Sequence, residues 1–152
     1  MDRFFGAVRQ IGYAVRDVDD AIRHFREVNG DISDFKSFEV TLDASGNYRY
    51  EGRPSRCRLK IAVAAVNCID FEFIQPLDGE HPSADFLARH GEGINHLGLY
   101  LQDLAPLRAA MLKDGGRVVI EGSFFISADR QGKFAYMQMG AGPLPLYELL
   151  EM

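Results

Sequence analysis

The chain has 152 residues, of which 47% are hydrophobic and 26% charged, and its formal net charge is −5. This composition is typical of one globular domain, and the acidic balance argues against a nucleic-acid partner because phosphate binding needs a basic surface. No apolar run approaches the roughly 20 residues of a membrane span, so no membrane partner is expected. The two cysteines show neither CxxC nor zinc-finger spacing, and we expect reduced thiols in a cytoplasmic protein.

The first half of the chain predicts a strand, a helix and three further strands. Residues 8–15 alternate in character, as a half-buried strand does. Asp17 is of the type favoured at an N-cap, and the helix that it opens is expected to stop at Gly30. Pro76 is expected to end the last strand of this half. The three further strands are expected within 37–50, at 57–66 and at 69–75.

The second half repeats this plan after a connecting segment. The connection carries a short helix that Gly91 and Gly93 close. A strand at 96–101 then leads to a helix that Asp103 caps and that stops at Gly115 and Gly116. The remaining strands are expected at about 117–121, 134–139 and 145–151.

One short sequence pattern occurs twice. Residues 10–18 and 96–104 both read polar, aliphatic, Gly, apolar, any, aliphatic, any, Asp, aliphatic, and residues 71–75 echo 147–151. The repeat predicts an α+β fold, in which two paired βαβββ modules form a curled, half-open mixed β-sheet barrel with helices outside. We expect a single domain over 1–152, divided into module 1 (about 5–77), a connecting segment (78–93) and module 2 (about 94–152).

Four polar side chains occupy matched positions of the two modules: Gln10, Glu72, His96 and Glu148. The opposite strand faces must cover the helices, so these four are expected on concave faces that converge. One imidazole, two carboxylates and an amide oxygen suit a divalent ion such as Zn²⁺, Ni²⁺, Co²⁺ or Mn²⁺. Taken singly, each is more often a satisfied polar residue, but two repeated glutamates among apolar neighbours favour a site. Gly12 and Gly98 are expected to leave space for a ligand beside them.

Other side chains are weaker candidates, each with an ordinary structural alternative. The expected substrate-binding residues are Tyr100, Phe125 and Tyr136, for which core packing is the alternative. Three cations alternate on one strand and suit either a phosphate-bearing tail or a solvated sheet edge: Arg56, Arg58 and Lys60. The remaining histidines are expected at the surface: His24, His81 and His90.

Three segments also carry a family resemblance. Residues 86–97 are similar to the stretch of methylmalonyl-CoA epimerases that leads to their central metal-binding histidine, here His96. Residues 71–76 and 147–150 resemble the strands that end the two modules of the same family. The chain therefore resembles the vicinal oxygen chelate superfamily, and within it the glyoxalase-like branch. That superfamily contains glyoxalase I, methylmalonyl-CoA epimerase, extradiol dioxygenases and antibiotic-resistance proteins.

The resemblance implies a metal-dependent isomerase or lyase of the epimerase or glyoxalase I type. One divalent ion, held at the four matched positions, would polarise a carbonyl while a carboxylate moves the adjacent proton. Glu148 is the implied base, and Glu72 is its counterpart for the opposite face of the substrate. The implied partners are a small carbonyl compound, with thioesters among the candidates, and a second copy of the chain in a homodimer.

The chain departs from the epimerase pattern at several positions. Gln10 stands where epimerases carry histidine, and Asn95 replaces one member of their frequent His-His pair. The ligand types instead match one class of glyoxalase I. The loop base of the epimerases has no clear counterpart, although Glu51 lies in the corresponding region.

Two other functions stay open from the sequence. A non-catalytic small-molecule binding protein, like the drug-binding members of the superfamily, would hold no metal. An extradiol dioxygenase is disfavoured because one central histidine cannot supply a two-histidine, one-carboxylate iron site.

Overall fold

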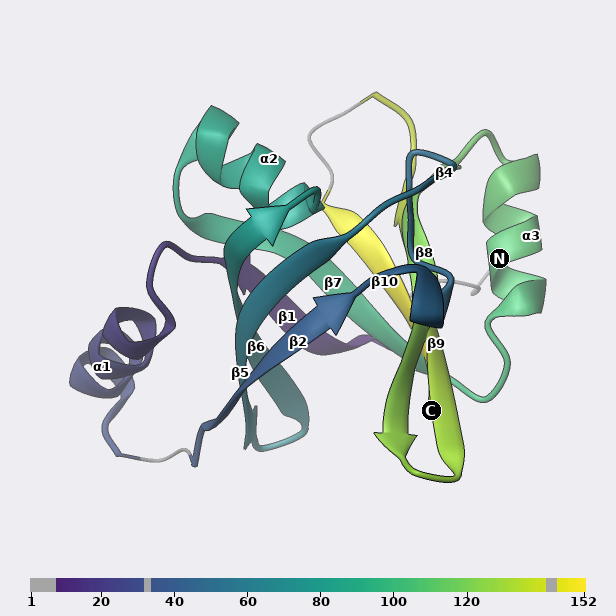
Figure 1. The fold of residues 1–152 in the computed structure, drawn as a ribbon. Coiled ribbons are helices and arrows are strands. Elements are labelled where there is room, and N and C mark those ends of the chain that lie inside the picture. Colours follow the sequence, from purple (N-terminus) through teal and green to yellow (C-terminus); the bar gives the residue numbers. More distant parts are fainter. Residues whose placement is uncertain (1–7, 32–33, 142–144) are drawn as a thin grey trace.

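The predicted βαβββ plan is present in both halves of the chain, in a computed structural model that describes residues 8–31, 34–141 and 145–152 (Figure 1). The elements of the first half are β1 (Val8–Ala14), α1 (Val18–Asn29), β2 (Lys36–Leu42), the 3₁₀-helix η1 (Ala44–Gly46), β3 (Arg49–Tyr50), β4 (Arg53–Pro54), β5 (Cys57–Val66) and β6 (Ile69–Gly79). Those that follow are α2 (Pro82–His90), β7 (Gly93–Leu101), α3 (Ala105–Lys113), β8 (Arg117–Ser127), β9 (Arg130–Gln138) and β10 (Leu146–Glu151). The start of the first predicted module, residues 5–7, lies outside the described residues.

Within the described residues the strands form one ten-stranded mixed sheet in the order β2-β5-β6-β1-β7-β10-β9-β8-β3-β4. The sheet curls around an interior, while α1 and α3 lie outside it on opposite sides (Figure 1). This arrangement confirms the predicted α+β half-barrel. The pairing of β3 with β8 adds a short segment of the first half to the far edge of the sheet, which the repeat did not predict.

The two halves join through the antiparallel pair of β1 and β7. The opposed residues at its centre are Gly12 with His96 and Gln10 with Gly98. On the outer sides of this pair, β6 runs parallel to β1 and β10 runs parallel to β7. The neighbours across these parallel pairs are Gly12 with Glu72 and Gly98 with Glu148. The register is therefore the same in both halves, and it brings the four matched positions to one seam.

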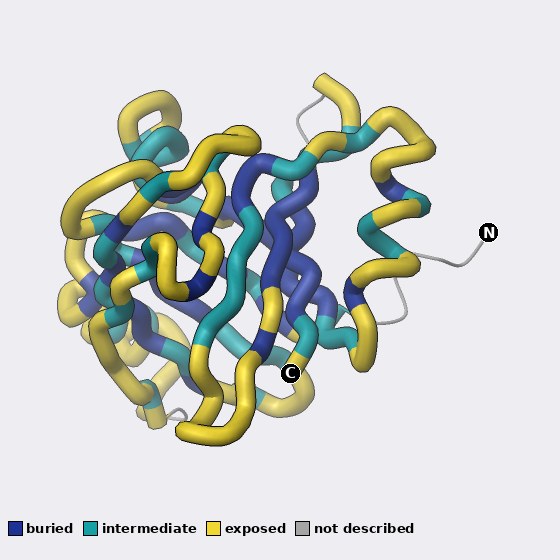
Figure 2. The backbone as a smooth tube through the Cα atoms, turned by 45° about the vertical axis from the view of Figure 1, so that its right-hand side comes forward, coloured by how far each residue is buried: buried dark blue, intermediate teal, exposed yellow. Residues whose placement is uncertain are grey.

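The helices cover apolar sheet faces, as their sequence pattern requires. Asp17 accepts a hydrogen bond from the Asp20 N–H as the N-cap of α1, and Gly30 follows the last turn, as predicted. Phe25 of α1 packs against the rings of Phe71 and Phe73 in β6, at centroid distances of 5.1 and 6.0 Å. In Figure 2 the buried segments concentrate in the central strands, whereas the hairpin tips and the outer sides of the helices are exposed.

Strand β6 is longer than predicted because it continues through Pro76 to Gly79. Pro76 lies opposite Leu59, and the register of the β5–β6 pair shifts between Arg58 and Leu59. A proline has no N–H to donate, but a local irregularity in the ladder removes the need for that hydrogen bond. The prediction that Pro76 ends the strand was therefore wrong.

Helix α3 begins at Ala105, with Leu104 rather than Asp103 in the N-cap position. The Asp103 carboxylate still accepts a hydrogen bond from the Ala105 N–H at 2.9 Å. Glu151 at the end of β10 accepts one from the Leu104 N–H at 3.1 Å. Two carboxylates thus satisfy backbone donors that a single predicted cap would have left open.

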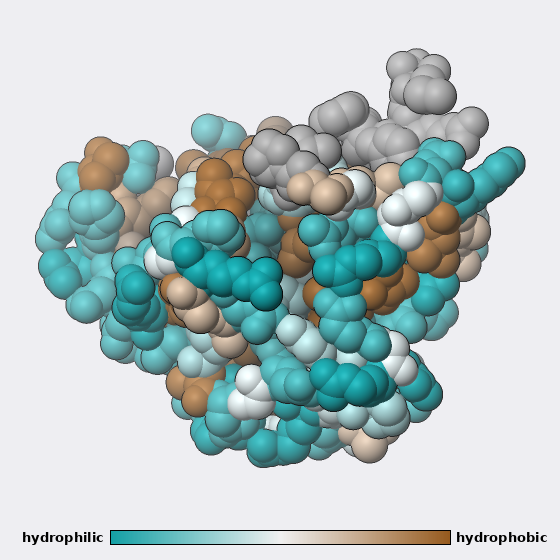
Figure 3. All heavy atoms as spheres, turned by 90° about the horizontal axis from the view of Figure 1, so that it is seen from above, coloured by the Kyte–Doolittle hydropathy of each residue, from teal (hydrophilic) through white to brown (hydrophobic). Residues whose placement is uncertain are grey.

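The remaining surface features agree with the composition. Cys57 is buried and Cys68 is exposed, and both are free thiols. Figure 3 shows hydrophilic side chains over most of the face seen from above, with apolar side chains in smaller groups. In the described part of the chain, no helix combines the length and the apolar character that a membrane crossing requires.

Candidate metal centre

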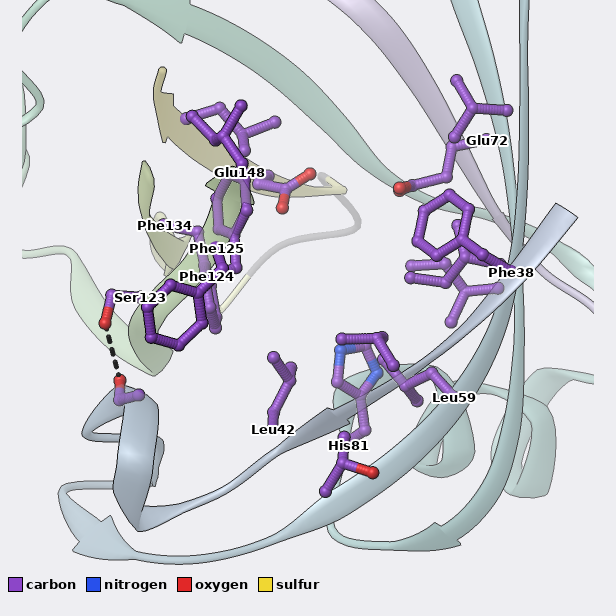
Figure 4. Close-up of a pocket in the computed structure, with 18 of the residues that line it drawn as sticks. Phe38, Leu42, Leu59, Glu72, His81, Ser123, Phe124, Phe125, Phe134 and Glu148 are labelled. Carbon is purple, nitrogen blue, oxygen red and sulfur yellow. Dashed lines mark hydrogen bonds between the residues drawn. The ribbon is translucent and has the colours of Figure 1, made fainter. Parts of the chain in front are cut away.

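The four matched polar side chains meet on the inner face of the sheet at the β1–β7 seam. Nε2 of His96 lies 3.2 Å from Oε2 of Glu72 and 3.2 Å from Oε2 of Glu148. It lies 3.3 Å from Oε1 of Gln10. All four side chains belong to buried residues, and His96 is 0% exposed. Figure 4 shows the two glutamate carboxylates approaching each other from opposite walls of a cavity.

Two glycines give these side chains the room that they need. A Cβ atom on Gly12 would lie 1.9 Å from Cε1 of His96, and one on Gly98 would lie 2.4 Å from Oε1 of Gln10. Each glycine therefore accommodates the polar side chain of its cross-strand neighbour. We predicted instead that both would leave space for a ligand. The space is real, but the side chains of His96 and Gln10 already fill it.

The cluster contains two buried carboxylate oxygens that lie near His96 but have no well-aligned hydrogen bond. Neither Oε2 of Glu72 nor Oε2 of Glu148 has a well-aligned hydrogen-bond donor among the described residues. Unpaired carboxylate oxygens away from water are costly. One ligand atom from each glutamate and one from His96 lie within 4.8 Å of one another, so a single cation between them would contact all three. The residues present therefore fit a divalent ion.

The protonation of the cluster reflects the same need for positive charge. Burial opposes protonation of His96, but the adjacent carboxylates of Glu148 and Glu72 outweigh it and raise the pKa of His96 to about 9. Burial also raises the pKa of Glu148, although the neighbouring His96 acts in the opposite direction. Without a metal, a proton on His96 would supply the charge that a bound cation supplies otherwise.

The cluster lies at the wall of a cavity of about 590 Å³ in the interior of the curled sheet. All three predicted substrate-binding residues line this cavity: Tyr100, Phe125 and Tyr136. Tyr136 is buried, with its ring centroid 4.9 Å from that of His96. Tyr100 donates its hydroxyl proton to Asp70 at 2.5 Å, so toward a bound molecule its oxygen can only accept. Phe125 is 65% exposed.

His81 also lines the cavity, contrary to the prediction that it lies at the surface. It is 2% exposed and is the N-cap residue of α2, where its Nδ1 accepts from the backbone N–H of Ser83 at 3.2 Å. The same nitrogen lies 2.7 Å from the Ser83 hydroxyl oxygen. Burial lowers the pKa of His81 to about 3, and the charge of His96 adds to this effect. The sequence did offer a signal, since a polar residue before Pro82 at a helix start suits an N-cap.

The weaker candidates have ordinary partners at the surface. Glu51 occupies the turn after β3, forms an ion pair with Arg117 at 2.5 Å and does not line the cavity. Arg56 precedes β5, and Arg58 and Lys60 belong to it. The three cations are paired as follows: Arg56 with Asp78 at 3.2 Å, Arg58 with Asp78 at 3.1 Å and with Glu39 at 3.2 Å, and Lys60 with Asp19 at 2.7 Å. These surface ion pairs agree with the solvated alternative. The expected sheet edge was wrong, because β5 lies between β2 and β6 in the sheet.

Several solved structures are similar to this fold. Methylmalonyl-CoA epimerase from Mycobacterium tuberculosis is 22% identical, with a TM-score of 0.63 over 99% of this chain and 91% of that chain. A variant of the Streptomyces coelicolor epimerase in complex with 2-nitronate-propionyl-CoA is 18% identical, with a TM-score of 0.64 over 95% of this chain and 96% of that chain. A 4-hydroxymandelate synthase variant from Streptomyces coelicolor is 16% identical, with a TM-score of 0.63 over 95% of this chain and 38% of that chain.

The fold is thus that of the vicinal oxygen chelate proteins, with a cluster of metal-ligand residue types at the seam between the two halves. A sequence profile assigns the family directly. The profile of the glyoxalase/bleomycin resistance protein/dioxygenase superfamily matches residues 9–136, and the chain belongs to this superfamily. No curated protein matches the chain in a sequence comparison.

Proposed function

We propose that the protein is a metal-dependent isomerase or lyase that moves a proton on the carbon next to a carbonyl group. The convergence of Gln10, Glu72 and Glu148 on Nε2 of His96 carries this proposal. A divalent ion such as Zn²⁺, Ni²⁺, Co²⁺ or Mn²⁺, bound by these four residues, would act as a Lewis acid toward the carbonyl oxygen. Epimerases and glyoxalase I, in the same superfamily, are the enzyme types that the proposal follows.

Glu148 is the proposed base. Its carboxylate faces the cavity, and burial raises its pKa above the ordinary value for glutamate. A raised pKa brings a carboxyl group closer to the operating pH at which proton transfer in both directions is efficient. Glu72 approaches from the opposite wall (Figure 4), so it is placed to return a proton to the other face of a planar intermediate. Two opposed carboxylates suit an epimerisation or a shift of a proton between adjacent carbons.

A deuterium-exchange experiment tests the proposal. The protein, reconstituted with each of the four ions, is incubated in D₂O with the N-acetylcysteamine thioester of β-ketooctanoic acid, and NMR follows loss of the α-proton signal. Glu148→Gln and Glu72→Gln keep an oxygen ligand but remove a base, so we expect exchange to fall by about a hundredfold or more in Glu148→Gln. Glu27→Gln, on the exposed side of α1, should leave the rate unchanged.

The opposite result is equally clear. Exchange no faster than in buffer with every ion, or equal rates in all variants, would contradict the proposed chemistry.

Thioesters are included because the similar epimerase structures hold CoA compounds. The predicted homodimer and cytoplasmic location stay predictions.

A non-catalytic binding protein is the second candidate function, and the apolar cavity of about 590 Å³ favours it. It would bind small molecules without any metal requirement. Ring cleavage by an extradiol dioxygenase is disfavoured because His96 is the one imidazole among the clustered residues in the described part of the chain.

A further inference from the structure

Resting on the proposed function, we infer that the substrate is a carbonyl compound with an apolar body free of phosphate, and that Nε2–H of His81 donates a hydrogen bond to its second oxygen. Three independent features of the cavity carry this inference. They are its apolar walls, its lack of cationic side chains and the fixed hydrogen-bond geometry of His81.

The walls of the cavity are aliphatic and aromatic. Apolar side chains reach it from both halves of the sheet, namely Val40, Leu42, Leu59, Ile61, Phe124 and Phe134. Phe38 and Phe125 also line it, and they are 50% and 65% exposed. Exposed aromatic rings at a cavity rim lose water contact when an apolar ligand covers them, which favours binding.

The charges around the cavity oppose a phosphorylated ligand. None of the described residues that line the cavity is a lysine or arginine. The charged residues in this lining are acidic, and they include Glu39 and Asp43 in addition to the two glutamates of the polar cluster. Arg58, the cation next to Glu39, is already paired with that residue and with Asp78. The net charge of −5 adds a general repulsion of polyanions. Among the described residues that line the cavity, a nucleotide-bearing thioester would therefore meet no cationic side chain.

His81 supplies the polar contact that such a cavity needs. Because Nδ1 accepts from the Ser83 backbone N–H, the neutral ring carries its proton on Nε2. That Nε2 has no hydrogen-bond partner among the described residues, although His81 is 2% exposed and lines the cavity. Figure 4 shows the ring projecting into the cavity below the two glutamates. A donor without a partner at the wall of a cavity favours a ligand that brings an acceptor oxygen.

A matched pair of thioesters tests the apolar, phosphate-free class. β-Ketooctanoyl-N-acetylcysteamine and β-ketooctanoyl-CoA share the acyl group and both carbonyls but differ in the nucleotide phosphates. Calorimetry at low salt should give an affinity for the first that is about tenfold or more above that for the second, and added salt should narrow the gap. Affinity for the CoA ester that equals or exceeds that for the short thioester would overturn this part of the inference.

A thermodynamic cycle with one protein variant and one ligand change tests the hydrogen bond from His81. The wild type and His81→Asn are each titrated with the octanoyl and β-ketooctanoyl thioesters of N-acetylcysteamine, because Asn preserves the N-cap but lacks the longer ring donor. The additional oxygen should improve affinity about five- to tenfold in the wild type and have little effect in the variant. His24→Asn, at an exposed histidine of α1, should behave as the wild type.

If the additional oxygen improves the affinity equally in the wild type and in His81→Asn, His81 does not bind that oxygen. If His81→Asn does not fold, the wild type alone is titrated with the two thioesters. Equal affinity for both thioesters would then contradict a hydrogen bond from His81 to the second oxygen. All titrations use metal-free protein beside metal-loaded protein. Binding of the short thioester without metal uptake would leave this inference intact while the proposed proton transfer fails. Metal-dependent exchange together with a higher affinity for the CoA ester would support the proposed proton transfer and contradict the phosphate-free substrate class.

Discussion

Gly12 allows His96 to occupy its position, since any Cβ at residue 12 would overlap the imidazole ring. We therefore expect Gly12→Ala to destabilise the fold by about 1–3 kcal/mol and to weaken metal binding at least about tenfold. Gly98→Ala should also be destabilising, because its Cβ would lie 2.4 Å from Oε1 of Gln10 and 2.7 Å from Cβ of the same residue, which is fixed to the backbone.

Chemical denaturation and metal titration of the two variants would check both expectations. Gly93→Ala serves as the control, since its Cβ would meet Phe86 at an ordinary distance of 3.6 Å. A Gly12→Ala protein that is as stable as Gly93→Ala and binds metal normally would show that the glycine is not needed for the cluster.

His81 should make the protein less stable in acid. The pKa of His81 is lowered to about 3 in the folded state, whereas an unfolded histidine titrates near 6.5. Between these values the unfolded state binds a proton that the folded state does not, so the free energy of unfolding falls as the pH falls from about 6.5 toward 3. From pH 7 to pH 5 this residue should account for a loss of about 2 kcal/mol.

Urea denaturation at pH 7 and pH 5 would measure that loss. His81→Asn keeps a capping acceptor for the Ser83 N–H but cannot titrate, so its stability should fall by about 2 kcal/mol less than that of the wild type over this interval. The same pH dependence in both proteins would contradict a neutral, buried His81.

At the residue scale, the repeat predicted the relative positions of the four polar side chains, whereas the surroundings of other residues were not predicted. Matched positions in two modules were enough to bring Gln10, Glu72 and Glu148 together with His96, because strand faces and register follow from the pattern. The partners of His81 depend on how α2 enters the fold, which local periodicity does not specify. For the same reason the sequence showed small residues at 12 and 98 but not which side chains would fill the space beside them.

At the scale of elements, α1 packs on the sheet through a cluster of aromatic rings that is separate from the polar site. Phe25 contacts Phe35, Phe71 and Phe73, with ring centroids 5.1–6.0 Å apart. We expect Phe25→Ala to lower the free energy of unfolding by about 1–3 kcal/mol, since a partly buried ring is lost. Metal affinity should stay within about twofold, because the cluster lies on the other face of the sheet.

Thermal denaturation and metal titration of Phe25→Ala, beside Phe25→Leu, would check this separation. Leu retains most of the apolar volume and should recover more than half of the stability. A loss of metal affinity in proportion to the loss of stability would show instead that helix packing and the polar cluster are coupled.

Element boundaries were less predictable than element types. The alternation and the caps predicted β1, α1 and β7. Strand β6 continues beyond Pro76 because the register of its pairing with β5 shifts there, so the ladder does not need the N–H that proline lacks. The N-terminus of α3 moved by one residue because Glu151, distant in sequence, satisfies the Leu104 N–H. Both differences arise from long-range contacts that a local pattern does not contain.

At the scale of the whole molecule, the internal repeat predicted the architecture because each module needs the other to complete its sheet. The β1–β7 pair joins them, and the polar cluster lies on that seam. The cavity differs in this respect, since its apolar walls and acidic rim come from side chains that the repeat does not relate. Its chemistry therefore required the structure.

Metal content is the measurement that tests the central claim most directly. Elemental analysis of untagged protein, after reconstitution with Zn²⁺, Ni²⁺, Co²⁺ or Mn²⁺ and gel filtration, should give about one equivalent of ion per chain. His96→Ala removes the nitrogen on which the other three proposed ligand side chains converge and should retain less than a tenth of that amount. No retained metal with any ion, or equal retention in His96→Ala, would contradict a metal centre at this seam.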